Sequence, residues 1–395
     1  MVVRLLYLAN NRIPSEKANS LQIMQMCHAF RRQGADVRLV VPHRVQPRSM
    51  RAVSDPFTYY GLKDPFPLVR LPCLDALEWA PDPLQHPTFA IQSASFALSV
   101  AAFLAIHRAD IYYSRDPLST VLLALCPTSL RRRSVYEAHT FPGPGVRRRL
   151  HLWAIGRIGR LVCISRGLAQ EYQSQGISEG RILVAPDAVD LDRFRSMPAR
   201  DAARSLLGIP RESHVVVYTG HLYRWKGVET LALASRLLPD GFLVYLVGGT
   251  ESDLATFRRF VAEQGLSRVK LTGQVPPDQV IPYLAAADVL ALPNSGGDVR
   301  SSRYTSPMKL FEYMAARRPI VASRLPSLQE VLRDGENALL VTPDDPAALA
   351  EGVKRIIDAP ALAGQMVERA WRDAQGYSWT ARARAILDFL GDDTA

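Results

Sequence analysis

The sequence predicts an α/β protein made of two Rossmann-like, doubly wound domains. Short, nearly continuous runs of Val, Ile and Leu alternate with longer helical stretches, as in parallel sheets whose strands are buried on both faces. A length of 395 residues is enough for two such domains, each with its own core. A polar, Pro-containing stretch at 196–198 marks the boundary, giving an N-terminal domain over 1–196 and a C-terminal domain over 197–375. We expect a final helix in 376–395 to pack back on the N-terminal domain.

The individual elements follow from the same alternation. In the first domain the strand candidates are 2–9, 36–41, 110–113, 134–137 and 161–164. In the second domain they are 214–218, 242–247, 269–271, 288–292, 319–322 and 339–341. The clearest helical stretches are 20–33, 88–106, 146–160, 228–237, 308–316 and 346–357. This order predicts right-handed βαβ units, with ligands beyond the carboxyl ends of the strands, in the cleft between the two domains.

Cysteine usage and the chain start predict a cytoplasmic protein. No cysteine belongs to a CxxC pair, so we expect four buried thiols in a reducing compartment, at Cys27, Cys73, Cys126 and Cys163. The apolar start has no charged segment or cleavage site before it, which favours a first strand over a signal peptide. The most membrane-like run, 88–106, is Ala-rich and interrupted by polar side chains, so we expect a packed helix and not a span.

The positive charge is concentrated in the first half. Residues 1–200 contain 26 Lys and Arg against 15 Asp and Glu, and within them 131–166 holds nine Arg and one acid. This segment, with its interleaved apolar residues, fits a surface for an anionic membrane or a plain solvated basic face. The first interpretation implies a peripheral protein on the inner face of the plasma membrane. No motif supports a nucleic-acid partner.

The segment 306–315, Ser-Pro-Met-Lys-Leu-Phe-Glu-Tyr-Met-Ala, is the most informative one. Ser306 is a good N-cap and Pro307 a good first helical residue. Free backbone N–H groups at such a helix start suit a diphosphate, and Lys309 adds a cation. Glu312, one turn further on, suits the hydroxyl groups of a ribose. The alternative is an ordinary capped helix with a surface glutamate.

Two further segments follow strands of the second domain. In 219–227, Gly220 permits close backbone approach, and His221, Arg224 and Lys226 provide cations for a phosphate. The spacing matches neither a P-loop nor GxGxxG, and the alternative is a basic surface loop. In Leu-Thr-Gly-Gln-Val, 271–275, backbone groups could face the edge of a base, although most glycines after strands mark only a turn.

Polar residues of the first domain stand where its strands end. Asn19 and Ser20 are N-cap candidates for the first helix, and a plain cap is the alternative to a binding role. Glu137 and His139 follow one strand and Arg115 follows another. A histidine at that edge could contact a sugar or stabilise a developing charge.

Together these segments resemble the retaining, nucleotide-sugar-dependent glycosyltransferases of family 4, which have the GT-B fold of two facing Rossmann-like domains with a deep cleft. The resemblance covers nearly the whole chain and rests on the order and spacing of 17–20, 184–190, 220–227, 271–275, 306–315, 334–341 and 377–379. Two positions depart from the family. The first of its usual two glutamates falls on Tyr304, and the Arg that usually precedes the phosphate-binding Lys falls on His221. We interpret both as variation and not as loss of activity.

The resemblance implies a role for each site residue. Lys226, aided by Arg224, holds the donor diphosphate, Glu312 binds the ribose, and His139 lies beside the transferred sugar. The catalytic residues implied are His139, Lys226 and Glu312. The donor-binding residues implied are Gly220, His221, Arg224, Lys226, Gly248, Gln274, Val275, Tyr304, Ser306, Pro307, Met308, Lys309 and Glu312. The acceptor-side residues implied are Asn19, Ser20, Arg115, Glu137 and His139.

The implied reaction moves a sugar from a UDP- or GDP-sugar to a glycan or glycolipid acceptor with retention of configuration. No metal or other cofactor is expected, since no DxD stands near a predicted strand end. Two other functions stay open. A nucleotide-sugar 2-epimerase has the same fold and needs no acceptor. A non-catalytic nucleotide-sugar binding protein would account for the departures at Tyr304 and His221.

Overall fold

The computed structural model describes residues 2–391, and the chain divides into two compact units. Unit 1 consists of Met1–Ile164, Leu168–Ala185 and Trp379–Ala395, as far as these segments are described. Unit 2 consists of Ser165–Gly167 and Pro186–Ser378. The main crossing therefore lies between residues 185 and 186, before the expected boundary at 196. The reason is that Val189 and Phe194 already belong to a hydrophobic cluster of unit 2.

Unit 1 contains a seven-stranded parallel sheet with the order β3-β2-β1-β4-β5-β6-β7. Its strands are β1 (Arg4–Leu8), β2 (Asp36–Pro42), β3 (Leu68–Leu71), β4 (Ile111–Ser114), β5 (Ser134–Ala138), β6 (Arg160–Cys163) and β7 (Ile182–Val184). The sequence prediction missed β3 and β7. Both are short strands at the edges of the sheet and only partly buried, so neither needs the long apolar run of a central strand.

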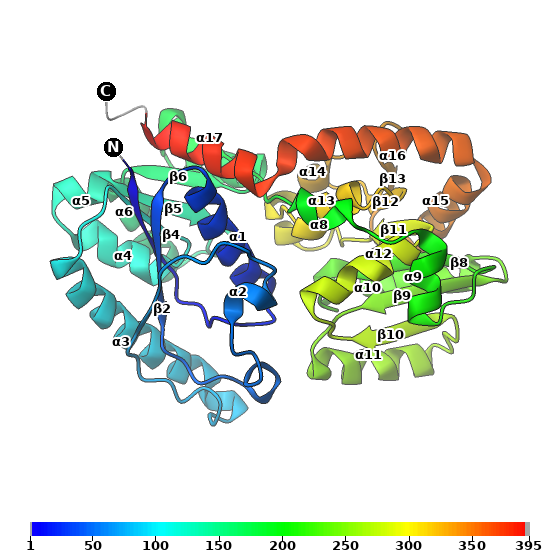
Figure 1. Cartoon of the computed structure of the whole chain (residues 1–395), viewed down its shortest axis with the longest axis horizontal. Coiled ribbons are helices and arrows are strands. Elements are labelled where there is room, and N and C mark those ends of the chain that lie inside the picture. Colours follow the sequence, from blue (N-terminus) through cyan, green and yellow to red (C-terminus); the bar gives the residue numbers. More distant parts are fainter. Residues whose placement is uncertain (1, 392–395) are drawn as a thin grey trace. The chain divides into compact units, whose positions relative to one another are not determined.

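Helices cover both faces of this sheet (Figure 1). They are α1 (Ala18–Arg32), α2 (Pro56–Tyr59), α3 (Gln85–Ile106), α4 (Pro117–Leu125), α5 (Thr128–Arg132), α6 (Val146–Arg157), α7 (Arg166–Ser174) and α17 (Trp379–Gly391). Helix α3 packs against α4, and α4 against α6, so these three form one layer. The C-terminal helix α17 packs against α1.

Unit 2 contains a six-stranded parallel sheet with the order β10-β9-β8-β11-β12-β13. Its strands are β8 (His214–Thr219), β9 (Phe242–Val247), β10 (Val269–Gly273), β11 (Val289–Leu292), β12 (Ile320–Ser323) and β13 (Leu339–Val341). Its helices are α8 (Leu191–Arg195), α9 (Arg200–Leu207), α10 (Val228–Ala234), α11 (Glu251–Glu263), α12 (Val280–Ala286), α13 (Met308–Ala315), α14 (Pro326–Gln329), α15 (Pro346–Asp358) and α16 (Pro360–Ala374). In each sheet the strand order reverses beside the strand that comes first in the chain, β1 in unit 1 and β8 in unit 2. This is the doubly wound arrangement that the alternation predicts.

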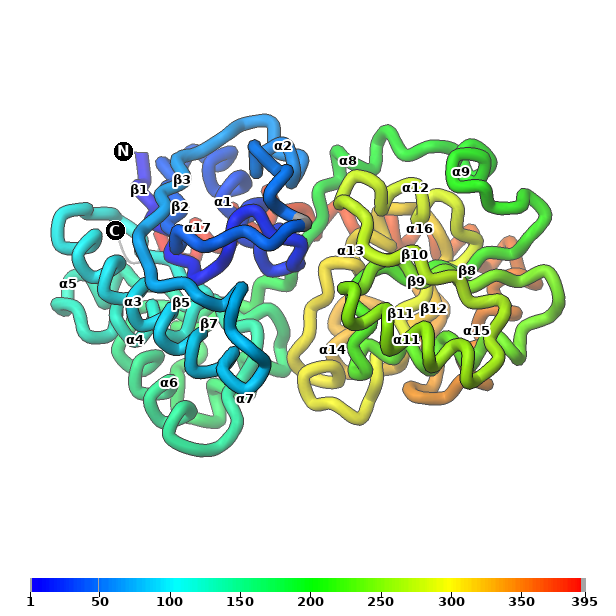
Figure 2. Tube along the Cα trace, turned by 90° about the horizontal axis from the view of Figure 1, so that it is seen from below, coloured from blue at the N-terminus to red at the C-terminus, as the bar shows by residue number. Residues whose placement is uncertain are grey.

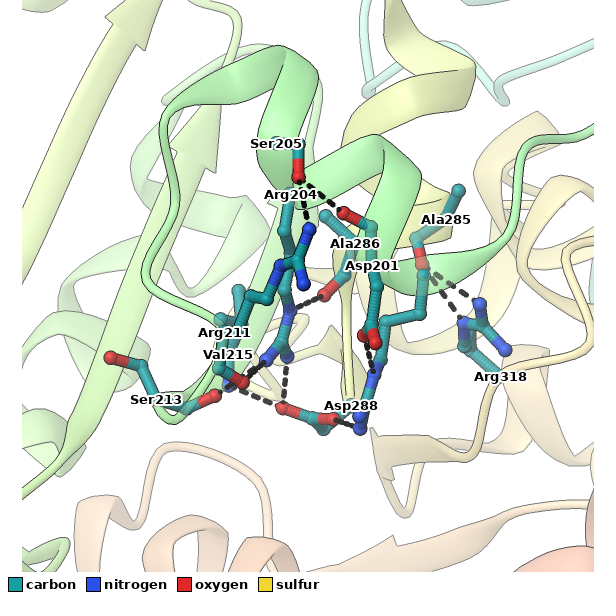
Figure 3. A network of polar contacts seen from close by, with 11 residues as sticks. Asp201, Arg204, Ser205, Arg211, Ser213, Val215, Ala285, Ala286, Asp288 and Arg318 are labelled. Atoms are coloured by element: carbon teal, nitrogen blue, oxygen red, sulfur yellow. Dashed lines mark hydrogen bonds and ion pairs between the residues drawn. The ribbon is translucent and has the colours of Figure 1, made fainter.

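A buried ion pair fastens α9 to the amino ends of the strands in unit 2 (Figure 3). The guanidinium of Arg204 is almost fully buried and lies 2.6 Å from Asp288, just before β11. Asp288 also accepts hydrogen bonds from Arg200 and from the backbone N–H of Val215. Each carboxylate oxygen is thereby satisfied, which a buried charge requires. This network lies at the strand ends opposite to those where α/β proteins bind ligands.

Two expectations about the chain need correction or refinement. Cys27 and Cys163 are buried free thiols, but Cys73 and Cys126 are only half-buried, because they lie at the ends of segments that reach the surface. Within residues 2–391, one segment is long and apolar enough to cross a membrane, judged by length and composition alone: Asp82–Ile106, which includes α3. One third of its most apolar window is buried in the protein.

Candidate functional site

Two loops of unit 2 meet beyond the carboxyl ends of β8 and β11, where the strand order reverses. The loop after β8 accepts a hydrogen bond from the loop after β11, since the backbone N–H of Ser295 donates to the carbonyl oxygen of Trp225 at 3.1 Å. Gly227 has a φ of +68°, and a Cβ on it would lie 1.7 Å from the carbonyl oxygen of Pro293. Only glycine allows this approach, so the sequence itself brings Lys226 to the switch point of the sheet.

Glycine also lines the neighbouring strand end. Gly248, directly after β9, has a φ of +117°, and a Cβ there would lie 2.6 Å from the carbonyl oxygen of Gly220. Gly220 follows β8 and donates its N–H to Val247. A Cβ on Gly220 would lie 3.0 Å from Nζ of Lys309. The side chain of Lys309 therefore reaches the backbone at the end of β8.

Two lysines at this point are held by aromatic rings. Nζ of Lys309 lies 3.6 Å from the ring centroid of Tyr218. Nζ of Lys226 lies 3.7 Å from that of Trp225. The ammonium group of Lys309 is buried and forms no hydrogen bond to any residue between 2 and 391. A buried ammonium without an acceptor is costly, so this position favours the binding of an anion.

The pKa values of the two lysines also show that burial disfavours their charged forms. Burial lowers the pKa of Lys226 to about 7, and the charge of Arg300 adds to the effect. Burial also holds the pKa of Lys309 well below its ordinary value, and the charge of Lys226 lowers it further, while Glu312 opposes this. The charge of Lys226 thus disfavours the charge of Lys309. A bound anion would favour the charged form of both lysines and thereby raise both pKa values.

Sequence reasoning missed Arg300. Its guanidinium lies 5.4 Å from the ring centroid of Trp225, the ring that also carries Lys226. Asp298 holds it with an Nη2–Oδ2 distance of 2.7 Å. Arg224, the expected helper of Lys226, is exposed instead. An Arg far along the sequence from 219–227 has no local signal there, and only the meeting of the two loops identifies it.

Helix α13 begins at Met308, the start of the predicted stretch 308–316, but its N-cap differs from the predicted one. Pro307 is its N-cap and Met308 its first residue, so Ser306 is not the N-cap. The hydroxyl of Ser306 instead accepts a hydrogen bond from the backbone N–H of Asp187 at 3.0 Å, which draws the serine away from the helix. The first N–H groups, at Met308 and Lys309, still lack partners inside the helix and point at the same end. An anion here gains both the helix dipole and the lysine.

Glu312 lies one turn further along α13. Burial raises the pKa of Glu312, while the charges of Arg193 and Lys309 oppose that rise. Arg193, from α8, was not predicted. Its Nη2 donates to the carbonyl oxygen of Pro277 at 2.6 Å.

The remaining donor-side residues of the prediction are distributed around these groups. His221 stacks on Tyr223 with ring centroids 4.9 Å apart, and its Nδ1 lies 3.8 Å from Oδ2 of Asp253. Burial lowers the pKa of His221, and the charge of Asp253 opposes this. Gln274 is exposed, whereas Val275 packs on a hydrophobic cluster of unit 2. Tyr304 is buried, and its carbonyl oxygen accepts a hydrogen bond from Ser165.

Unit 1 contains a second polar cluster, centred on Glu137 at the end of β5. The carboxylate is fully buried. It accepts hydrogen bonds from Gln22 at 2.6 Å, from Tyr113, and from Nη1 of Arg382 at 3.2 Å. Nε2 of His139 lies 2.6 Å from it. Burial opposes ionisation, but Arg382 and His139 outweigh burial and hold the pKa of Glu137 well below its ordinary value.

This Glu137 cluster collects part of the predicted acceptor side. Arg115 joins it indirectly, because its Nη1 donates to Oε1 of Gln22 at 2.7 Å. Arg382 also donates to the carbonyl oxygen of Ala185, where the chain leaves unit 1. His139 is held by Glu137 and keeps a partly exposed ring. Arg382 and Gln22 carried no signal in the sequence, since both stand on helices far from β5 along the chain.

Asn19 and Ser20 are not N-caps, contrary to expectation. Lys17 is the N-cap of α1 and forms no side-chain cap, so both residues lie inside the first turn. The hydroxyl of Ser20 donates to the carbonyl oxygen of Arg12 at 3.2 Å. That bond ties the helix start to the loop after β1.

Within residues 2–391, His, Cys, Asp and Glu side chains form no group of three or more arranged as metal ligands.

Comparisons with known proteins match two parts of the chain to glycosyltransferase models. Residues 21–193 match the model described as Glycosyltransferase Family 4, and residues 213–359 match the model described as Glycosyl transferases group 1. A D-inositol 3-phosphate glycosyltransferase of Streptomyces avermitilis is 29% identical over 233 residues, which cover 56% of this chain and 48% of the relative. The chain thus spans about half the length of the curated relatives it matches.

Solved structures show the same fold over nearly the whole chain. Sucrose-phosphate synthase from Thermosynechococcus elongatus aligns with a TM-score of 0.77 at 21% identity, covering 99% of each chain. Anabaena Alr3699/HepE in complex with UDP-glucose aligns with a TM-score of 0.74 at 18% identity, covering 99% of this chain and 100% of that one. At these identities the likeness concerns the fold, which is GT-B.

Proposed function

Since the chain belongs to the family 4 glycosyltransferases, we propose that it transfers a sugar from a nucleoside-diphosphate donor to a glycan or glycolipid acceptor. The observation that carries this proposal is the buried ammonium of Lys309, which lies beside Lys226 and the start of α13 and has no hydrogen-bond acceptor among residues 2–391. A diphosphate supplies the two negative charges that this arrangement lacks.

The same groups serve the chemistry. As the bond between the sugar and the diphosphate breaks, negative charge grows on the leaving phosphate. Lys226, Lys309 and the N–H groups at the start of α13 are fixed in place before that happens, so they stabilise the charge without rearrangement. We assign the ribose hydroxyls to Glu312, whose carboxylate accepts hydrogen bonds.

Retention and metal independence are part of the proposal. An oxygen of the acceptor attacks the anomeric carbon on the face that the nucleoside diphosphate leaves. The bond to the leaving phosphate oxygen breaks, and that oxygen takes the proton of the acceptor. The lysines take over the charge stabilisation that a divalent cation provides elsewhere. In unit 1, His139 is the group we assign to the transferred sugar and the acceptor, oriented by Glu137.

The donor is a UDP- or GDP-sugar in this proposal. Support for UDP comes from Anabaena Alr3699/HepE, whose structures hold UDP and UDP-glucose. The acceptor is a glycan or a lipid-linked glycan, and the place of action is the cytoplasmic face of an anionic membrane, as the Arg-rich segment 131–166 suggests.

Donor turnover tests the proposal. The purified protein is incubated with UDP-glucose, UDP-galactose or GDP-mannose, in parallel without and with EDTA, and released sugar is followed by NMR. We expect one donor to release sugar with its anomeric configuration retained, and Lys226→Ala to slow release about a hundredfold. Lys270→Ala, at an exposed position of unit 2, is the matched control.

Four results would contradict parts of the proposal. Release of sugar from none of the three donors by wild type, and equally fast release by Lys226→Ala, each count against the diphosphate site. Isomerisation of a donor without acceptor points to an epimerase. Release that stops with EDTA contradicts metal independence.

A further inference from the structure

Helix α3 of unit 1 has two apolar faces, but only one of them is packed. The inner face contributes Phe96, Val100 and Phe103 to a hydrophobic cluster shared with the sheet. No residue between 85 and 106 carries a charge. A helix that is apolar on all sides is normally buried on all sides. Here the opposite face is left exposed by the part of the chain that the structure describes.

The uncovered face of α3 is continuous along the helix. Ile91 is 56% exposed, Leu98 is 74% exposed and Ile106 is 77% exposed. Ala94, Ala102 and other small residues lie between them and are also exposed. Their spacing of three to four residues places them on one side of the helix. Isolated exposed leucines are ordinary, but an exposed stripe over the whole of α3 indicates an interaction surface.

The neighbouring helices extend this surface. Figures 1 and 2 show α3, α4 and α6 next to one another on unit 1, in agreement with their packing contacts. Leu125, at the end of α4, is 67% exposed, and 117–130 carries no charge. On α6, Leu150 and Trp153 are exposed. We call the exposed sides of α3, α4 and α6 the outer helical face.

The segment that contains α5 and α6 is rich in arginine, although Arg148 of α6 lies 3.7 Å from Glu171 of α7. Residues 131–160 contain eight Arg and one acid, Glu137, which is fully buried in its own cluster. The guanidinium of Arg157 lies 5.1 Å from the ring centroid of Trp153, and its Nε donates to the carbonyl oxygen of Ala124 on α4. Cationic groups are therefore interleaved with exposed aromatic and aliphatic side chains.

We propose that the outer helical face seats on an anionic lipid bilayer, with α3 lying in the plane of the interface. Leu98, Ile91 and Ile106 enter the boundary of the acyl chains, and the arginines of α5 and α6 meet the lipid phosphates. This deepens the proposed function, because it names the surface through which the enzyme reaches a lipid-linked acceptor. It rests on the proposed function in one respect: a lipid-linked acceptor is the reason why the protein would bind a membrane.

Charge and packing favour this occupant over two others. α3 does not span the bilayer, since its inner face is part of the core of unit 1. A second copy would form a two-fold interface that places the same patch against itself. The arginines around each patch would then face arginines, and an anionic surface avoids that repulsion.

Co-sedimentation with vesicles tests the proposal. The full chain is mixed with vesicles of phosphatidylglycerol and phosphatidylethanolamine, and with vesicles of phosphatidylcholine alone. We expect binding to the anionic vesicles, weakened at 1 M NaCl, where the Debye length falls to about 3 Å. Leu98→Glu should weaken binding at least about tenfold. Leu206→Glu is the matched control, because Leu206 is an equally exposed leucine on α9 of unit 2.

Several outcomes would overturn the proposal. They are absence of binding to anionic vesicles, equal loss in Leu98→Glu and Leu206→Glu, and a dimer in solution that Leu98→Glu converts to a monomer without vesicle binding. Circular dichroism and UDP or GDP binding show that each variant is folded. Lys226→Ala should bind vesicles like wild type. If the wild-type protein binds nucleotides but not anionic vesicles, only the membrane proposal fails. If it binds anionic vesicles but no nucleotide, only the proposed function fails.

Discussion

The two units bury charge in opposite ways. Glu137 in unit 1 is surrounded by donors, including Tyr113, His139 and Arg382, and its pKa is held low. Lys309 in unit 2 is equally withdrawn from water, but its ammonium has no acceptor among residues 2–391 and its pKa is also low. For a carboxylate, a low pKa means that the charge is stabilised. For a lysine it means the opposite.

This difference distinguishes the Glu137 cluster from the proposed donor site at the two lysines. A charge that is fully compensated within the protein keeps its neighbours in place, as Glu137 does for His139. A charge that lacks compensation gains most from a ligand of opposite sign. We therefore expect changes in the Glu137 cluster to act mainly on stability, and changes at the lysines to act mainly on donor binding.

The largest effect is expected for Arg382→Leu. Removal of the guanidinium leaves Glu137 buried with its main counter-charge lost, which costs about 3–5 kcal/mol in the free energy of unfolding. Urea denaturation at pH 7 measures this. Arg384→Leu, on the same helix but exposed, should stay within about 0.5 kcal/mol of wild type. Similar losses in both variants would mean that Arg382 does not stabilise Glu137.

Lys309→Met should separate stability from binding. A methionine removes a buried cation without a hydrogen bond, so the unliganded protein should be at least as stable as wild type in urea. Affinity for the nucleoside diphosphate should fall by a factor of about ten to a hundred, the worth of a charge-assisted hydrogen bond. Calorimetric titration measures the affinity. A stability loss with unchanged affinity would assign Lys309 to the fold.

Gly227→Ala tests the loop that carries Lys226. Its φ of +68° and the clash with the carbonyl oxygen of Pro293 both oppose a side chain, and we expect a loss of about 1–3 kcal/mol in unfolding free energy. Gly208→Ala is the control, since Gly208 has a φ of +65° and open space around it. The excess loss of Gly227→Ala over this control reports the close approach alone. No excess would show that the two loops do not meet as described.

The pH dependence of donor binding is expected to be smaller. Lys226 has a pKa of about 7, and only its charged form suits a diphosphate, so affinity should weaken about tenfold from pH 6 to pH 8. Stability of the unliganded protein should change the other way. Between pH 7 and the ordinary lysine pKa of 10.5 the unfolded chain binds the extra proton, and stability rises with pH. Lys226→Met should flatten both profiles, and an unchanged profile would place the titration elsewhere.

The features that could be predicted from the sequence are those that depend on residues close together in the chain. Alternating apolar runs indicated the central strands, and the glycines and lysines of 219–227 and 306–315 singled out Lys226 and Lys309, for which a diphosphate site stays a proposal. The edge strands β3 and β7 were not predicted, because an edge strand needs few buried apolar residues and so lacks the pattern of a central strand. Helix α3 was predicted to be packed, yet the structure buries only one of its faces. That outcome depends on whether another layer covers it, which no local pattern shows.

Long-range partners could not be predicted. Arg382 binds a carboxylate 245 positions earlier in the chain, and Arg300 approaches Lys226 through a shared indole ring. Ser306 was predicted to be an N-cap because Ser-Pro commonly opens a helix. Its hydroxyl instead accepts a hydrogen bond from the backbone N–H of Asp187. Each of these depends on which segments the fold brings together, and not on residue types at short spacing.

Thermal unfolding of wild type and Lys226→Met with UDP, GDP, ADP and CDP tests the central claim most directly. A diphosphate at about a hundred times its dissociation constant adds roughly 2.7 kcal/mol, which is readily seen. The account predicts that one of these nucleotides raises the melting temperature of wild type and leaves that of Lys226→Met nearly unchanged. A shift with none of them, or the same shift in both proteins, would contradict a diphosphate site at the two lysines of unit 2.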